Sequence, residues 1–108
     1  MKKYGLQSAE YIKCLFIDYL LSRCKELIIG NELMYGIKRK VVDLVVLQKN
    51  KIIAVEIKSD GDNLNRLEEQ ISEYKKIFDY ILIVTTEKHA SRISEVVPSE
   101  IGIYIFKE

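Results

Sequence analysis

The stretch from Val41 to Lys58 constrains the fold of this chain more than any other part of the sequence. It contains two runs rich in β-branched apolar residues, Val41–Leu47 and Lys51–Lys58, joined by the polar tip Gln48–Asn50. Two such runs on either side of a short polar segment are typical of a β-hairpin. Because apolar residues occupy most positions of both runs, we expect both strands to be largely buried.

Three charged residues lie inside these apolar runs: Asp43 in the first run, and Glu56 and Lys58 in the second. A carboxylate buried in a strand is costly unless it is paired or bound to a metal. Because side chains alternate along a strand, Glu56 and Lys58 are expected to point to the same face of the sheet. Two acids and a lysine on one sheet face predict a divalent-metal site beside a positioned cation.

The chain has 108 residues, the size of one domain that buries about two-thirds of its unfolded surface. Its 48% hydrophobic and 31% charged residues are ordinary for a globular protein, and no apolar run approaches the roughly 20 residues that span a bilayer. The amino terminus lacks the apolar segment of a signal peptide. Cys14 and Cys24 have no His or Cys nearby and fit neither a zinc site nor a disulfide framework. We therefore expect a cytoplasmic protein.

The net charge of the chain is only +1 at pH 7. A protein that binds nucleic acid by charge alone carries a much larger basic excess. If DNA is the ligand, the affinity must come from local basic patches, a bound metal, oligomerisation or a partner protein.

Helical and strand patterns alternate along the rest of the chain. The expected elements are a helix over Ala9–Arg23 capped by Ser8, a first strand over Leu27–Tyr35 bent at Gly30, a helix over Leu64–Phe78 capped by Asp62 or Asn63, a strand over Ile81–Thr86, a weak helix over Glu87–Val97, and a last strand over Ile101–Phe106. The short connections from the hairpin through the second helix imply a right-handed crossover, so the Ile81–Thr86 strand should run parallel to the Lys51–Lys58 strand. His89, a lone histidine, is given little weight.

The charged residues of the hairpin suit one reaction in particular. Two carboxylates from adjacent strands can hold Mg²⁺, which prefers oxygen ligands and keeps several waters. A bound metal lowers the pKa of its water and neutralises charge on a phosphate under attack. Lys58 is placed to orient that water or to stabilise the developing negative charge. The set Asp43, Glu56 and Lys58 therefore predicts phosphodiester hydrolysis.

The same residues carry a resemblance to a known family. Asp43, twelve intervening residues and Glu56-Ile57-Lys58 on consecutive strands, followed by Gln70-Ile71-Ser72-Glu73-Tyr74, resemble the PD-(D/E)xK nuclease superfamily and its RecB-like, small stand-alone bacterial or phage members. The proline that often precedes the aspartate is replaced by Val42. The resemblance implies a single domain over residues 1–108 with an α/β fold: a restriction-endonuclease-like core in the order αβββαβ, with a central mixed β-sheet flanked by helices.

The resemblance also implies roles for individual residues. Asp43 and Glu56 would bind Mg²⁺, or Mn²⁺, while Lys58 positions the nucleophilic water and Gln70 and Tyr74 shape the site. A further acid usually completes the metal site in this family: Glu10 fits that position, Glu32 is the rival, and the sequence does not separate them. Among the basic residues, Arg39, Lys40 and Arg66 are either solvated surface charges or phosphate contacts.

These observations predict a metal-dependent deoxyribonuclease that hydrolyses DNA phosphodiester bonds in repair, recombination or phage and mobile-element biology. Because the charge of the chain is nearly neutral, we expect a homodimer or a partner protein that presents the DNA. The alternative is a catalytically inactive module of the same fold that binds nucleic acid or another protein.

Overall fold

A computed structural model describes residues 8–36 and 40–107 of the chain. Its elements are α1 (Ala9–Arg23), β1 (Ile28–Tyr35), β2 (Lys40–Gln48), β3 (Lys51–Ile57), α2 (Leu67–Tyr74), β4 (Tyr80–Thr86), α3 (Glu87–Val96) and β5 (Gly102–Phe106). The strands form one five-stranded sheet in the order β1-β2-β3-β4-β5. The first three strands pair antiparallel, and β4 and β5 continue the sheet in parallel. The predicted mixed α/β architecture with flanking helices is confirmed.

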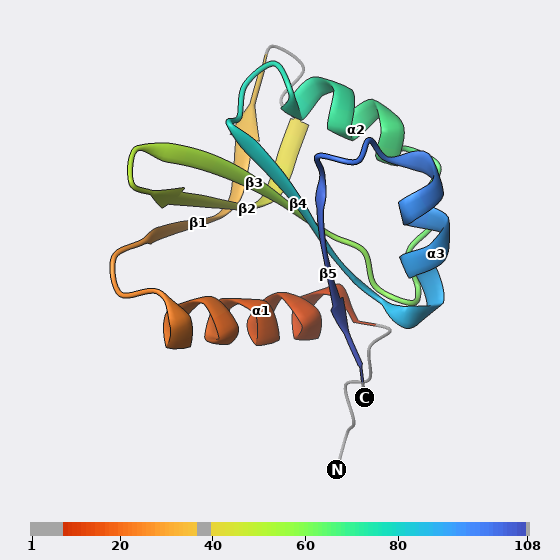
Figure 1. The fold of residues 1–108 in the computed structure, drawn as a ribbon, viewed down its shortest axis with the longest axis horizontal. Helices are drawn as coiled ribbons and strands as arrows, with labels where there is room; N and C mark the ends of the chain where they lie inside the picture. The colour runs from red at the N-terminus through yellow and green to blue at the C-terminus, as the bar shows by residue number, and fades with distance from the viewer. Residues whose placement is uncertain (1–7, 37–39, 108) are drawn as a thin grey trace.

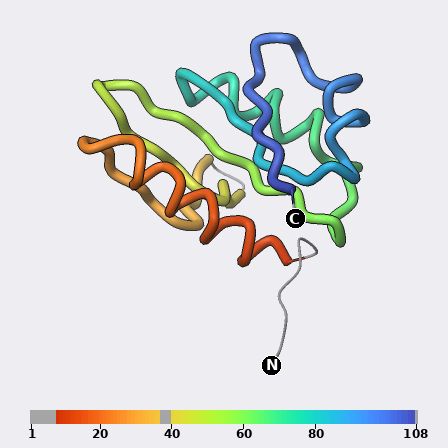
Figure 2. Tube along the Cα trace, turned by 60° about the horizontal axis from the view of Figure 1, so that its bottom comes forward, coloured from red at the N-terminus to blue at the C-terminus, as the bar shows by residue number. Residues whose placement is uncertain are grey.

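The sheet has α1 on one face and α2 and α3 on the other (Figures 1 and 2), and it separates two apolar cores. On one face, Ile12 and Phe16 of α1 pack in one cluster with sheet residues that include Val55 of β3. On the other face, α2 and α3 pack in a second cluster that includes Ala54 of β3. Because neighbouring residues of β3 face opposite cores, Glu56 lies on the same side as Ala54, beneath α2.

The first helix and the hairpin form where the sequence predicts them. The hydroxyl of Ser8 accepts the backbone N–H of Tyr11 at 3.3 Å and caps α1. The hairpin tip is Lys49-Asn50, and both residues have positive φ angles, 49° and 65°. Two consecutive residues with positive φ are the mark of a type I′ turn, whose twist matches that of the flanking strands.

The irregular residue of β1 is Glu32 rather than Gly30. Glu32 has a φ of 51°, in the left-handed region that side chains rarely adopt. Pairs Asn31↔Leu44 and Leu33↔Val42 flank this position, and Glu32 and the opposite residue, Asp43, are missing from the ladder. Both strands change direction along their length (Figure 1). The bend predicted at Gly30 therefore lies two residues later, beside Asp43.

The second helix is shorter than predicted, and its predicted cap is wrong. Its N-cap residue is Arg66, which makes no side-chain cap bond. The carboxylate of Asp62 instead accepts the backbone N–H and the hydroxyl of Ser59 at 2.8 and 2.9 Å, and Asn63 accepts the N–H of Asn65 at 3.1 Å. Short polar side chains often bond to nearby backbone in this way, and here the turn uses the two groups that were expected to start the helix.

The remaining elements match their predictions. β4 runs parallel to β3, with Ile53 opposite Tyr80 and Ile57 opposite Val84, so the carboxyl ends of the two strands meet at one edge of the sheet. α3 and β5 follow in the expected places. In the part of the chain that the structure describes, no helix has the length and apolar character needed to cross a membrane.

Candidate cation site

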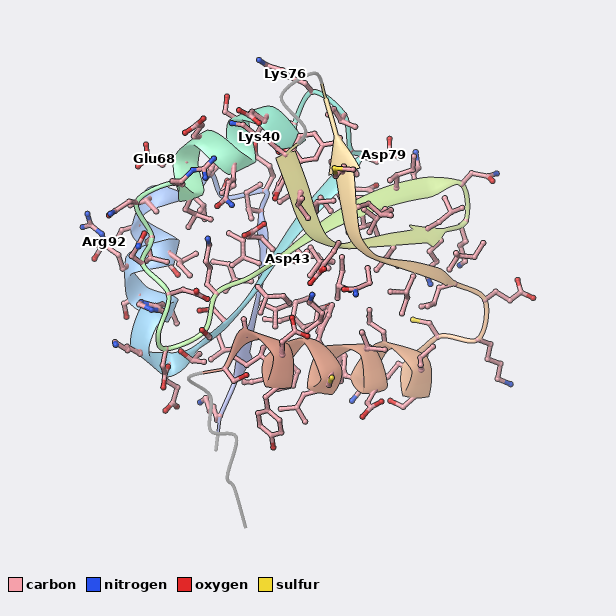
Figure 3. All side chains as sticks on the ribbon, turned by 180° about the vertical axis from the view of Figure 1, so that it is seen from behind. Lys40, Asp43, Glu68, Lys76, Asp79 and Arg92 are labelled. Carbon is pink, nitrogen blue, oxygen red and sulfur yellow. The ribbon has the colours of Figure 1, made fainter. Side chains whose placement is uncertain are left out.

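Asp43 and Glu56 come together where the β2–β3 ladder ends. The last pair in that ladder is Leu44↔Val55, and the next position along the same register places Asp43 opposite Glu56. Asp43 Oδ2 accepts the backbone N–H of Ile57 at 2.8 Å. Asp43 lies near the middle of the molecule, whereas Glu68 and Arg92 project from its outer side (Figure 3). The predicted meeting of acids from adjacent strands is therefore present.

Three further predicted site residues surround the Glu56 carboxylate, which is 4% exposed. The Tyr74 hydroxyl donates to Oε1 at 2.6 Å, and Gln70 Nε2 donates to Oε2 at 3.1 Å. Lys58 Nζ lies 3.3 Å from the same Oε2. Glu56 and Lys58 share a face because they are two residues apart on an extended chain, and Gln70 and Tyr74 share a face of α2 because they are four apart.

The environment favours a proton on this carboxyl pair near neutral pH. Burial, together with the charge of Asp43, raises the pKa of Glu56 to about 7, although the bonds from Tyr74 and Lys58 act in the opposite direction. Burial also raises the pKa of Asp43, against the Ile57 N–H and the ammonium of Lys13. Burial and the neighbouring Glu56 raise the pKa of Tyr74, which keeps its hydroxyl a donor. Two like charges at close range do not both ionise readily, so the pair holds one proton until the pH rises to about 7.

Lys13 belongs to the site, and the sequence reasoning missed it. Its side chain is on the buried side of α1 with Ile12 and Phe16, and the residue is 5% exposed. Nζ donates to Asn31 Oδ1 at 2.9 Å and to Glu32 Oε1 at 3.3 Å. The signal was available: position 13 falls between Ile12 and Phe16 on the apolar stripe of the helix, where a lysine is unusual.

The two acids proposed to complete a metal site both contact Lys13. Glu10 Oε1 is 3.5 Å from Lys13 Nζ, and the side chains of Glu10 and Glu32 are 74% and 57% exposed. Within residues 8–36 and 40–107, no group of three or more His, Cys, Asp or Glu side chains is arranged to hold a metal. The carboxylates that remain for a cation are those of Asp43 and Glu56.

The donors at this position nevertheless suit a hydrated Mg²⁺ or Mn²⁺. Such ions bind through one or two carboxylates and keep several waters. Among the residues that the structure describes, the buried side-chain oxygen of Gln70 has no hydrogen-bond partner, so it offers a third oxygen beside Glu56. A buried polar atom left without a partner is rare, and such an oxygen can serve as a ligand.

The basic residues considered as phosphate contacts are placed differently from one another. Lys40 Nζ pairs with Glu69 Oε1 at 2.8 Å and with Glu73, so its ammonium is held against α2. Arg66 is exposed immediately before α2. Arg39 lies outside the described residues. Cys14 and Cys24 are both free thiols.

Comparison with known proteins gives a consistent family. The family model for bacteriophage P4 protein cII matches residues 3–108. Protein cII of Enterobacteria phage P4 is 31% identical over 98 residues, which cover 89% of this chain and 37% of that protein. The chain thus spans little more than a third of the length of the curated relative that it matches.

These matches correct the prediction from the short motif. The predicted membership in the PD-(D/E)xK nuclease superfamily is wrong, and the predicted deoxyribonuclease, with its hydrolase class and its role in DNA repair, is not supported. The resemblance rested on five common residue types, Asp43, Glu56, Lys58, Gln70 and Tyr74, and charged residues at such spacings also occur without that chemistry. A match along nearly the whole sequence is the stronger signal. This chain belongs to the bacteriophage P4 protein cII family.

Proposed function

We propose that this chain is a non-catalytic binding module, in which Asp43 and Glu56 bind a hydrated Mg²⁺ or Mn²⁺ ion that contacts a phosphate of DNA. The observation that supports it is the carboxyl pair, with Glu56 4% exposed and Asp43, which is half-buried, opposite it on the neighbouring strand β2. A buried acid pair is expensive to keep without a bound proton or cation. A bound divalent cation would offset this cost, which gives the pair a role in binding.

The proton and the cation are expected to compete for the pair. The pKa of Glu56 is raised to about 7, so near neutral pH the pair easily loses the proton that a cation must replace. Tyr74 and Gln70 hold the Glu56 carboxylate in one orientation through bonds of 2.6 and 3.1 Å. A carboxylate held in place requires little reorganisation when an ion binds.

The near-neutral charge of the chain favours a bridging cation over direct electrostatic binding. With a net charge of +1, the surface attracts a phosphate backbone weakly. A divalent ion adds positive charge at one point, beside the Lys58 ammonium, which is 3.3 Å from Glu56. Mg²⁺ bound by two carboxylates still has coordination positions for a phosphate oxygen.

We also propose that the core from α1 to β4 is restriction-endonuclease-like. Support comes from the order helix, three antiparallel strands, helix and parallel strand, with β3 next to β4. A shared fold does not carry a shared activity, so this arrangement is compatible with a module that binds without cutting.

The test is fluorescence anisotropy of a labelled DNA duplex, titrated with the protein in Mg²⁺ or Mn²⁺ and again in EDTA. We expect EDTA, Asp43→Asn and Glu56→Gln each to weaken binding about tenfold or more, because each removes the bridging charge. Glu68→Gln is the matched control: it removes one carboxylate charge on the outer face of α2 (Figure 3) and should leave binding unchanged.

Two outcomes would contradict the proposal. Equal affinity with and without the cation, or in the two site variants, would show that the acid pair plays no part in binding. Shortened DNA on a denaturing gel, dependent on Glu56, would show that the module is catalytic. We expect the labelled strand to be recovered at full length.

A second observation favours self-association. Ile28, Leu47 and Ile52 are cross-strand neighbours at one end of β1, β2 and β3 and are 67%, 38% and 40% exposed. β1 is an edge strand, and edge strands can pair with another chain. We propose that a second copy of the chain covers this patch.

Sedimentation equilibrium tests this self-association. Leu47→Lys should yield monomers, whereas the control Glu95→Lys, at an exposed position of α3, should leave the dimer intact. A monomeric wild type would refute the proposal.

A further inference from the structure

Lys13 is a buried cation on the opposite side of the sheet from Lys58, and it contacts Glu32, the β1 residue opposite Asp43. The helix that carries it, α1, covers one face, whereas Glu56, Gln70 and Tyr74 meet on the other. Asp43 lies at the bend of β2, where its partner in β1 is missing from the ladder, and it is influenced from both faces. The charges of Lys13 and Lys58 both lower the pKa of Asp43, against the larger effect of burial, so both ammonium groups lie close enough to act on this carboxylate.

The bend of β1 lies at the two residues that hold the Lys13 ammonium, Asn31 and Glu32. Glu32, opposite Asp43, has a φ of 51°, a conformation that costs a non-glycine residue free energy. With the chain in this conformation, Glu32 Oε1 and the adjacent Asn31 Oδ1 lie 3.3 and 2.9 Å from Lys13 Nζ. The ammonium is therefore held by Asn31, Glu32 and Glu10, and the carboxylate of Asp43 lies on the neighbouring strand opposite Glu32.

We propose that the Lys13 ammonium is an internal competitor of the divalent cation at Asp43, and that Asn31 and Glu32 hold it back from that position. This inference rests on the proposed function, because it concerns the same cation site. It assigns Glu32 and Glu10 to Lys13 rather than to the metal. Lys13 is a positioning residue here, since it contacts neither the cation nor DNA.

The physical reason is charge at short range in a buried setting. An ammonium close to a bound divalent ion repels it, and the repulsion is screened little where water is excluded. When the ammonium turns toward Asp43, it neutralises one of the two carboxylates that the ion needs. Removing the charge of Lys13 should therefore tighten cation binding, although it removes no ligand.

The experiment is a calorimetric titration of the whole chain with Mn²⁺. Lys13→Met keeps an apolar side chain of similar length on the buried side of α1 and should bind Mn²⁺ about tenfold more tightly than wild type, or better. Lys13→Arg keeps the charge and should stay near the wild-type affinity. Lys51→Met removes a lysine charge at the exposed hairpin end and corrects for the change in net charge. Circular dichroism confirms that each variant is folded.

A double-mutant cycle separates the two roles open to Glu32. If Glu32 acts through Lys13, Glu32→Gln weakens Mn²⁺ binding in the wild-type background, because the ammonium is released toward Asp43. The same change has no effect in the Lys13→Met background. If Glu32 is a direct ligand, its replacement weakens binding equally in both backgrounds, which would overturn the inference.

The remaining outcomes separate the inference from the proposed function. If wild type binds Mn²⁺ as tightly as Lys13→Met does, or more tightly, the proposed role of Lys13 is wrong. The proposed cation site would not be affected by that result. Binding by Lys13→Met alone would support the inference in its strongest form. No binding by either protein would overturn the proposed cation site, and the competition with it.

Discussion

Replacing Glu56 by glutamine is expected to remove much of the dependence of stability on pH between about 4.5 and 7. The side chain is 4% exposed and sits between Tyr74, Gln70, Lys58 and Asp43. Its pKa is about 7 in the folded chain, against an ordinary 4.5. The folded state therefore holds the Glu56 proton more tightly than the unfolded state does.

The sign and size of the effect follow from this difference. Below pH 4.5 the carboxyl is protonated in both states, and Glu56 contributes its full stability. As the pH rises through 7 that contribution is lost, because the unfolded chain releases the proton first. The two pKa values differ by about 2.5, and each pH unit corresponds to about 1.36 kcal/mol, so the loss is about 3 kcal/mol.

The glutamine variant lacks this titration and is expected to be the more stable protein above pH 7. The Tyr74 hydroxyl can still donate to the amide oxygen of the new side chain. Once the Gln70 amide turns over, its oxygen, which has no partner among the described residues, takes the place of Nε2 and accepts from the new NH₂ group. Asp43, whose pKa is raised in the same direction, stays in both proteins and contributes to both.

The measurement is the free energy of unfolding in urea, by circular dichroism, at intervals from pH 4 to pH 8 for both proteins. The difference between them should grow by about 3 kcal/mol in favour of Glu56→Gln as the pH rises. The exposed Glu69 and Glu100, whose pKa values are lowered by Lys40 and Lys75, occur in both proteins and cancel. Two parallel stability curves would refute the assignment of a raised pKa to Glu56.

Three other substitutions test the structure around the site by the same unfolding measurement. Tyr74→Phe removes the 2.6 Å bond to Glu56 and should cost about 1.5–3 kcal/mol at pH 8; an unchanged stability would mean that the bond is absent. Ile71→Ala opens a cavity in the core under α2 and should cost about 2–5 kcal/mol, whereas a cost below about 1 kcal/mol would place Ile71 at the surface. Replacing Lys49-Asn50 by Asn-Gly suits the two positive φ angles of the tip and should raise the stability by about 1 kcal/mol; a loss would contradict the type I′ turn.

The hairpin and the first helix could be predicted because their signals are local. Alternating and continuous apolar runs around Lys49-Asn50 specify two strands, and Ser8 before an apolar stripe specifies the start of α1. The late start of α2, at Leu67 rather than at the predicted Leu64, could not be predicted from local signals. Asp62 and Asn63 suit a helix cap and a turn equally, and in the structure both bond within the turn before α2.

In the candidate site, too, the residues placed by local geometry could be predicted and those placed by tertiary packing could not. Glu56 and Lys58 were predictable neighbours because strand geometry gives them one face, and Gln70 and Tyr74 follow from the spacing of a helix. Lys13 could not be placed near Asp43 from sequence, since their proximity depends on α1 packing across a bend at Glu32. The family was misjudged because a handful of residues carried the inference, whereas the similarity to protein cII extends over residues 3–108.

The proton count on cation binding tests the central claim most directly. Mn²⁺ titrations by calorimetry at pH 7, in two buffers of different ionisation enthalpy, give the number of protons released per ion bound. Because the pKa of Glu56 is about 7, wild type should release about half a proton at this pH, and more at pH 6. Asp43→Asn and Glu56→Gln should lose the binding. Mn²⁺ binding with no proton release, or binding unaffected by both substitutions, would contradict a cation site at the Asp43–Glu56 pair.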